Sequence, residues 1–234
     1  MMFGFGKKRV EVPERTAVFV SEVGLVRTDN QDNVLVSPHH GVFCVADGMG
    51  GGAEGAKASA TVCHELKMAL QVDEADFASR IATVQNALVD ANYAIFSYAR
   101  ERGFAQMGTT AAVLVFDPDD PTSAAAIHVG DSRIYRIRHG LAERLTRDHR
   151  VPGGNTLTRA VGAAPTVRCD IRETDVRSGD RFVVCSDGVS GVMSDARLAV
   201  FASGGSIETA AERLAAEVVK AGAPDNYSFV LVQT

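Results

Sequence analysis

The chain has 234 residues, of which 46% are hydrophobic and 23% are charged, a composition that excludes disordered, collagen-like and disulfide-scaffold proteins. The length favours one large domain with a continuous core. Lys and Arg number 24 against 29 Asp and Glu, so the net charge of −5 excludes a basic field that would favour nucleic acid or an anionic membrane as the main partner.

The N-terminal segment lacks the pattern of a signal peptide, because Met1–Arg9 carries basic residues without a following apolar segment. No later apolar run approaches the length of a membrane span, about 18 residues. The cysteines lack C-x-x-C spacing and are expected to be buried free thiols of a reducing compartment: Cys44, Cys63, Cys169 and Cys185. We therefore expect a cytoplasmic protein without membrane insertion, with an N-terminal extension over residues 1–15 and a single domain over residues 16–234.

Three helices are predicted along the chain. The first is expected from about Glu54 to Gln71, and the last from Ile207 to Lys220 with Ser206 as its N-cap and Gly222 as its stop. Between Glu74 and Arg102, apolar residues recur at alternating spacings of four and three, which is typical of one stripe on a long helix. The stripe consists of Phe77, Ile81, Val84, Leu88, Ala91, Ile95 and Tyr98, and nearby Tyr93 and Phe96 are assigned to the same core.

Strand signals are short and mostly consecutive in the sequence. This arrangement favours antiparallel sheets covered by helices over a winding of alternating strands and helices, so the expected fold class is α+β. The predicted strands are Thr16–Val20, Val34–Ser37, Val42–Ala46, Thr110–Phe116, Ala124–Val129, Ile134–Arg138, Val167–Glu173, Phe182–Cys185 and Tyr227–Val232.

Acidic residues recur at the ends of these strands. Two strands that are apolar throughout run into Asp-Gly pairs, at Asp47 and Asp187. A single Asp-Gly pair is ordinary turn chemistry, but an acidic side chain at the end of a central strand is costly to desolvate unless it is paired or binds a cation. Asp131 follows a third strand and Asp225 precedes the last one. Four such carboxylates suggest a common cleft.

The chemistry of these residues favours a hard cation. Carboxylate oxygens without His or Cys companions select Mg²⁺ or Mn²⁺ rather than zinc, and none of the six histidines has zinc-ligand spacing in the sequence. One aspartate can bridge two such ions and hold a two-metal hydrolytic centre. A glycine after each aspartate leaves the backbone carbonyl accessible to the metal or to water.

Eight short motifs follow one another along the chain. They are Arg27-Thr28-Asp29-Asn30-Gln31-Asp32, Asp47-Gly48-Met49-Gly50-Gly51, Met107-Gly108-Thr109-Thr110, Val129-Gly130-Asp131-Ser132-Arg133, Leu145-Thr146-Arg147-Asp148-His149, Leu157-Thr158-Arg159-Ala160-Val161-Gly162, Ser186-Asp187-Gly188 and Asp225-Asn226. In this order they resemble the bacterial branch of the PPM family of metal-dependent Ser/Thr protein phosphatases, over about residues 16–233. The resemblance implies a four-layer α-β-β-α sandwich with a two-metal site at one edge of two antiparallel sheets.

The resemblance also implies roles for individual residues. Asp47 would bridge two Mn²⁺ or Mg²⁺ ions, the Gly48 carbonyl would bind one of them, and Asp187 and Asp225 would bind the other. Asp32 would act mainly through metal-bound water. These assignments make Asp47 and Asp32 catalytic residues and place all five among the metal ligands.

Three further residues receive roles in the same way. Arg27 would hold the substrate phosphate as a catalytic residue, for which its planar guanidinium is well suited. Asp131, helped by Asp187, resembles the ligand pair for a weaker third ion. His149 is interpreted as a packing residue at a strand end.

Three departures from the family pattern are visible. Gln31 stands where many members have glutamate, so the metal affinity is expected to be lower. Met49 stands where eukaryotic members carry a histidine proposed as general acid, so the proton for the leaving group must come from water. The flap is truncated to about residues 150–156, so we expect an open cleft and a weak preference for the sequence around the phosphorylated residue.

The resemblance therefore implies a signalling phosphatase that hydrolyses phospho-Ser and phospho-Thr by attack of a metal-bridging hydroxide. Its expected partners are phosphorylated proteins, among them a bacterial Ser/Thr kinase and the substrates of that kinase, and it is expected to be a monomer. Two alternatives are a catalytically silent binding protein of the same fold and a hydrolase of small phosphate esters. The presence of Asp47, Asp187 and Asp225 together favours an enzyme over the silent protein.

Overall fold

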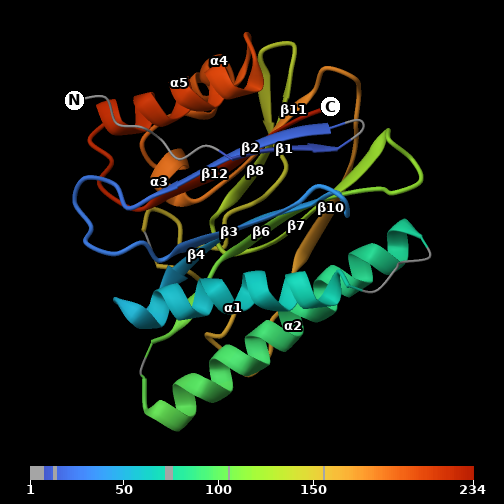
Figure 1. The fold of residues 1–234 in the computed structure, drawn as a ribbon. Coiled ribbons are helices and arrows are strands. Elements are labelled where there is room, and N and C mark those ends of the chain that lie inside the picture. The colour runs from blue at the N-terminus through green and yellow to red at the C-terminus, as the bar shows by residue number, and fades with distance from the viewer. Residues whose placement is uncertain (1–7, 13–14, 72–75, 105, 155) are drawn as a thin grey trace.

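A computed structural model describes residues 8–12, 15–71, 76–104, 106–154 and 156–234. Two antiparallel sheets lie face to face, and helices cover the outer face of each, which gives four layers (Figure 1). The prediction of an α+β fold of this kind is confirmed. The expected N-terminal extension over residues 1–15 falls partly outside the described residues, of which 8–12 form the first strand.

The first sheet has the strand order β1-β2-β12-β11-β8-β9. Its strands are β1 (Lys8–Val12), β2 (Arg15–Glu22), β8 (Arg133–Arg138), β9 (Leu141–Arg144), β11 (Arg181–Cys185) and β12 (Tyr227–Gln233). All residues of β11 are buried between β8 and β12, as the apolar sequence Phe182–Cys185 predicts; Arg181 at its start is buried as well.

The second sheet has the order β10-β7-β6-β4-β3, and β5 pairs with the end of β4. Its strands are β3 (Asp32–Ser37), β4 (Val42–Met49), β5 (Gly108–Thr109), β6 (Ala111–Phe116), β7 (Ser123–Val129) and β10 (Asp170–Asp175). The long apolar strand β4 lies between β3 and β6, so it is again an interior strand.

Helices α1 (Ala53–Ala69) and α2 (Phe77–Arg102) cover the second sheet, and α3 (Asp187–Ser190), α4 (Asp195–Ala202) and α5 (Ile207–Lys220) lie on the side of the first (Figure 1). The predicted stripe on α2 is confirmed, since Val84, Leu88, Ala91 and Ile95 are buried. The start of α5 is also as predicted, because the Ser206 hydroxyl accepts a hydrogen bond from the Thr209 amide.

The assignment of Tyr93 to the core was wrong, because its side chain is 71% exposed. It follows Ala91 by two positions, which is about 200° around the helix and therefore faces away from the buried stripe. In the described part of the chain, no helix combines the length and the apolar character that a membrane span requires.

The hydrophobic core has three parts, one between the sheets and one under each helical layer. Between the sheets, the ring of Phe116 packs edge-on against Phe43 and Phe182, with centroid separations of 6.0 and 5.4 Å. Phe182 comes from the first sheet and the other two from the second, so these aromatic contacts hold the sheets together. This packing fixes where the strand ends of the two sheets meet.

Candidate metal centre

The five acidic residues that the sequence analysis selected lie at ends of five strands. Asp47 is at the end of β4, Asp32 is the first residue of β3, and Asp131 follows β7. Asp187 follows β11 as the first residue of α3, and Asp225 precedes β12. Because the two sheets pack face to face, these ends come together at one edge of the sandwich.

A cleft of about 720 Å³ opens at this edge. Its polar side is lined by Arg27, Asp47, Gly48, Asp131, Asp187 and Asp225. Asp32 does not line the cleft; it pairs directly with Asp47 across strands β3 and β4 and is only 5% exposed. The structure therefore brings all the selected carboxylates together, with Asp32 behind the others.

Burial and mutual repulsion raise the pKa values of these carboxylates. Burial, and then the charges of Asp32 and Asp187, raise the pKa of Asp47 well above its ordinary value. Burial also raises the pKa of Asp32 to about 6, against the opposing effect of hydrogen bonds from Ser228 and Ser186. Burial and the charge of Asp225 raise the pKa of Asp187 in the same way. Such a group of anions is unfavourable at neutral pH unless a cation compensates it.

Two observations fit a divalent cation. Asp32 Oδ1 is buried and has no hydrogen-bond partner in the parts of the chain that the structure describes. A Cβ at Gly48 would come within 2.0 Å of the Gly55 carbonyl oxygen and 2.7 Å of the Gln31 carbonyl oxygen, so only glycine fits where the backbone passes Asp47. Carboxylate and carbonyl oxygens are the donors that Mg²⁺ and Mn²⁺ prefer.

Backbone hydrogen bonds fix the position of Asp47. The Asp47 amide donates to Thr110 Oγ1 at 3.0 Å, and the Asp47 carbonyl accepts from the Thr110 amide at 2.8 Å and from Thr109 Oγ1 at 2.9 Å. Thr110 Oγ1 also lies 2.6 Å from Ser132 Oγ, next to Asp131. The Gly-Thr-Thr motif thus holds two of the carboxylates in place, a role that the sequence analysis did not assign.

Arg27 lies on the loop between β2 and β3, with a side chain that is 53% exposed. Its Nη2 donates to Asp225 Oδ2 at 2.8 Å. The loop is clamped by the neighbouring Asn226, whose Nδ2 donates to the carbonyls of Val23 and Asp29 and whose Oδ1 accepts from the Gln31 amide. Asn226 is a supporting residue whose only signal in the sequence was its place in the last motif.

A second arginine touches the cluster from the short flap segment. Arg150 Nη2 lies 3.2 Å from Asp131 Oδ2, and its Nε lies 3.6 Å from Asp148 Oδ2. Burial and the charge of Asp187 raise the pKa of Asp131 to about 6, and the charge of Arg150 opposes this. A side-chain cation therefore lies at the carboxylate that was expected to bind a third ion, and the sequence analysis did not anticipate it.

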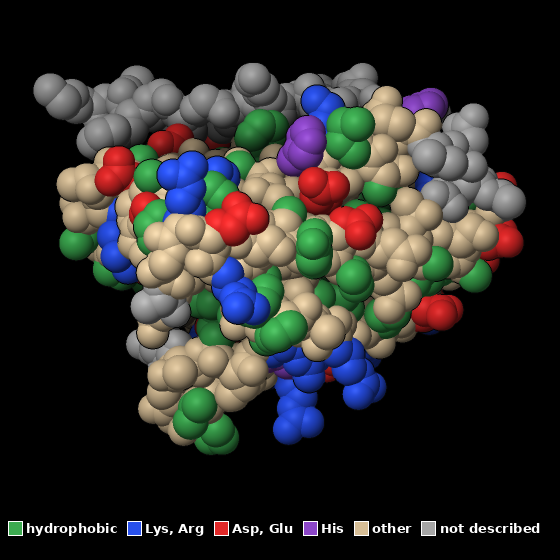
Figure 2. Space-filling model, turned by 90° about the horizontal axis from the view of Figure 1, so that it is seen from below, with side chains coloured by type: hydrophobic (Ala, Val, Ile, Leu, Met, Phe, Trp, Pro, Cys, Tyr) green, Lys and Arg blue, Asp and Glu red, His purple; other side chains and the backbone are tan. Residues whose placement is uncertain are grey.

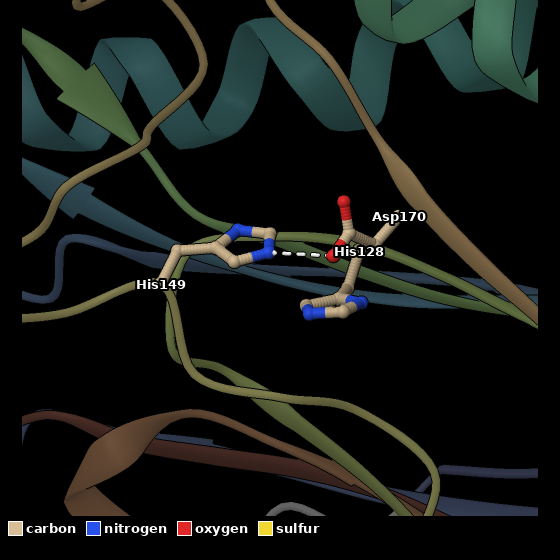
Figure 3. Close-up of side chains that lie close together, drawn as sticks. All are labelled: His128, His149 and Asp170. Carbon is tan, nitrogen blue, oxygen red and sulfur yellow. Dashed lines mark hydrogen bonds and ion pairs between the residues drawn. The ribbon is translucent and has the colours of Figure 1, made fainter.

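A separate group of possible metal ligands lies outside the cleft lining, consisting of His128, His149 and Asp170 (Figure 3). Their ligand atoms lie within 4.8 Å of one another, although the two histidines are far apart in the sequence. The rings are stacked, with centroids 4.6 Å apart and an interplanar angle of 19°.

Hydrogen bonds already engage this group. His149 Nδ1 accepts from the Gly130 amide at 3.1 Å, so Nε2 carries the proton and donates to Asp170 Oδ2 at 3.1 Å. Asp170 also accepts from Arg159 at 2.6 Å. His149 is thus a buried packing residue that also holds the turn leading to Asp131.

Comparisons with known proteins agree with the geometry. The family model for protein phosphatase 2C matches residues 24–222. Serine/threonine protein phosphatase PstP of Mycobacterium tuberculosis is 29% identical over 230 aligned residues, covering 90% of this chain and 43% of PstP. The chain therefore spans less than half the length of that relative.

Two solved structures illustrate the similarity in three dimensions. PppA, described as a key regulatory component of T6SS in Pseudomonas aeruginosa, has a TM-score of 0.88 and 30% identity, over 95% of this chain and 98% of PppA. The catalytic domain of PstP in complex with 2 manganese ions has a TM-score of 0.80 and 28% identity, over 94% of this chain and 97% of that domain.

Proposed function

The chain belongs to the protein phosphatase 2C family, and we propose that it is a metal-dependent phosphatase that removes phosphate from Ser and Thr residues of proteins. The observation that carries this proposal is the cleft in which Asp47, Asp187, Asp225 and Arg27 meet. A catalytically silent protein would not need to keep such a group of buried, mutually repelling carboxylates.

We assign the metal ligands by carrying over the roles that the family resemblance implies onto the residues that meet in this cleft. Asp47 would bridge two Mn²⁺ or Mg²⁺ ions, with the Gly48 carbonyl on one of them and Asp187 and Asp225 on the other. When bound, the ions lower the pKa of a water molecule so that it can attack phosphorus, and they neutralise the charge that develops on the phosphate. Asp32 supports the site from behind through its contact with Asp47 across the strands.

Arg27 is assigned to the substrate phosphate. Its guanidinium is exposed at the rim of the cleft, and its observed partner Asp225 belongs to the proposed ligand set. When Asp225 binds a metal ion, its attraction for Arg27 is weakened, and the guanidinium is available to donate two hydrogen bonds to phosphate oxygens. Met49 at the cleft carries no ionisable group, so the proton for the leaving hydroxyl is assigned to water.

The substrates we propose are phosphorylated proteins, among them a Ser/Thr kinase of the same cell and its targets. We also propose that the enzyme acts as a monomer in the cytoplasm. A hydrolase of small phosphate esters is the competing function, because the same ligands would serve both reactions.

The test is phosphate release from a phosphothreonine peptide, the matching phosphotyrosine peptide and para-nitrophenyl phosphate, with Mn²⁺ or with EDTA. We expect turnover only with the metal, and a higher kcat/KM on the phosphothreonine peptide than on either other substrate. Asp187→Asn should abolish the activity. A preference for the small ester would favour the competing function, and phosphate release in EDTA would contradict the metal centre.

A further inference from the structure

The cleft has an apolar side next to the carboxylates. We infer that this apolar wall, formed by Met49, Phe96, Phe104, Met107 and Leu157, is a subsite for one large apolar side chain close to the phosphorylated residue of the substrate. The inference rests on the proposed phosphatase function and adds a class of preferred substrate to it.

Met49 connects the wall to the metal centre. It follows Asp47 by two positions on β4, so both side chains leave the strand on the same face. The Met49 Cε atom lies close to Gly108: a Cβ atom added at Gly108 would be only 2.9 Å from it. The thioether is therefore held over the backbone of β5, and an extended peptide whose phosphate occupies the proposed metal centre would place a neighbouring side chain beside it.

Phe104 is placed rigidly by the end of α2. Gly103 adopts a left-handed conformation with φ 72°, its amide donates to the Arg100 carbonyl, and the Phe104 amide donates to the Ala99 carbonyl at 2.9 Å. This is the pair of bonds of a Schellman motif, which stops the helix and fixes the next residue. The Phe104 ring contacts Tyr98 at a centroid distance of 6.1 Å and remains 36% exposed at the cleft.

The rest of the wall is anchored in the core. Met107 is only 4% exposed, and Phe96 is half-buried on α2 with the guanidinium of Arg100 5.9 Å from its ring centroid. Hydrophobic side chains on the face seen in Figure 2 lie scattered among polar ones, whereas those of the wall share one concave site with the proposed catalytic residues. This continuity with the phosphate site argues for a substrate side chain as the occupant.

The wall changes an expectation drawn from the sequence. The short flap suggested weak preference for residues around the phosphate, but Phe96, Phe104 and Met107 supply an apolar surface from another part of the chain. Burying one large apolar side chain there should improve kcat/KM by about ten- to a hundredfold.

The test uses phosphothreonine peptides in which each position from three before to three after the phosphorylated residue carries Phe, Leu, Ala or Glu. We expect Phe or Leu at one position to raise kcat/KM at least about tenfold over Ala. Phe104→Ala and Phe96→Ala should reduce this Phe-to-Ala ratio to near one. Because the Phe-to-Ala ratio of kcat/KM is measured separately for each variant, a loss of activity that affects both peptides equally does not change it. Tyr93→Ala is the matched control, because Tyr93 is an exposed aromatic residue of α2 outside the cleft lining, and its ratio and basal activity should stay unchanged.

If the active enzyme has the same kcat/KM on all the peptides, the subsite is excluded. It is also excluded if the Phe-to-Ala ratio of kcat/KM is unchanged in both Phe104→Ala and Phe96→Ala. Inactivity toward every peptide and toward para-nitrophenyl phosphate would overturn the proposed function instead. In that case the affinities of the Phe and Ala phosphopeptides, measured by calorimetry, still test the subsite, because equal affinities would exclude it.

Discussion

Replacing Asp47 with Asn should have opposite effects on stability with and without metal. Without metal, Asp47 is a buried carboxylate facing Asp32, Asp187 and Asp131, and the substitution removes its charge with little change in shape. Neutralising one of several buried like charges removes their mutual repulsion, and single substitutions typically change the free energy of unfolding by about 0.5 to 3 kcal/mol, so we expect the metal-free variant to be more stable by about 1 to 3 kcal/mol. For a domain of this size that raises Tm by roughly 2 to 12 °C.

With metal the order should reverse. At a Mn²⁺ concentration of about 100 times its Kd, the wild-type protein gains about 2.7 kcal/mol, whereas the variant has lost the bridging ligand and gains little. Its turnover should fall by at least about 10³-fold, because both ions stabilise the same displacement.

The assay is thermal unfolding in EDTA and along a Mn²⁺ titration, with phosphate release measured on the same samples. Asp90→Asn is the matched control, since Asp90 is exposed on α2, and its metal response should equal that of the wild type. A variant at position 47 that melts lower in EDTA, or that responds to Mn²⁺ like the wild type, would refute the assignment of Asp47.

Three further outcomes follow from the same structure. Arg27→Ala should raise KM more than it lowers kcat, with a loss of about ten- to a hundredfold in kcat/KM for a charge-assisted contact; an unchanged KM in steady-state kinetics would contradict its role. Arg150→Ala should strengthen the weakest Mn²⁺ site about three- to tenfold in calorimetry, because guanidinium and metal compete for Asp131, and an unchanged isotherm would exclude that competition. Burial lowers the pKa of His128, which faces His149, Asp170 and Arg159, so on acidification below about pH 6.5 the unfolded chain takes up a proton that the folded chain resists. The raised pKa values of Asp32 and Asp131 act in the opposite direction and are present in both proteins. As the pH falls from about 7 to 5.5, the Tm of the wild type should therefore decrease relative to that of His128→Asn; a constant difference in Tm would remove His128 from this dependence.

The sequence predicted several elements whose structure is decided by local chemistry, although the short helix α4 with its N-cap at Ser194 was missed. The limits of α5 and the buried stripe on α2 agree with the structure because capping and helical spacing act within a few residues. Strand β9 escaped prediction because Leu141–Arg144 has no buried residue and therefore no apolar pattern. Tyr93 was wrongly assigned to the core because the prediction considered its apolar character and not its angular position on the helix.

Asp47, Asp131 and Asp187 could be selected from the sequence because each follows an apolar strand, and Asp225 because it precedes one, whereas Asp32 was assigned only through the family resemblance. Their partners could not, since these are set by contacts between distant segments. Arg27 meets Asp225 across 198 positions, and His128 meets His149 across two strand ends. Arg150 reaches Asp131 because the β8–β9 hairpin returns the chain to the end of β7, where the His149 amide donates to the Gly130 carbonyl.

Anomalous diffraction at the manganese absorption edge, from crystals grown with Mn²⁺, tests the central claim most directly, because it locates each ion without reference to activity. Two peaks are predicted in the cleft, one on each side of the Asp47 carboxylate, with the Gly48 carbonyl on one ion and Asp187 and Asp225 on the other. Manganese found only at His128, His149 and Asp170, or a single ion that does not touch Asp47, would contradict the two-metal centre.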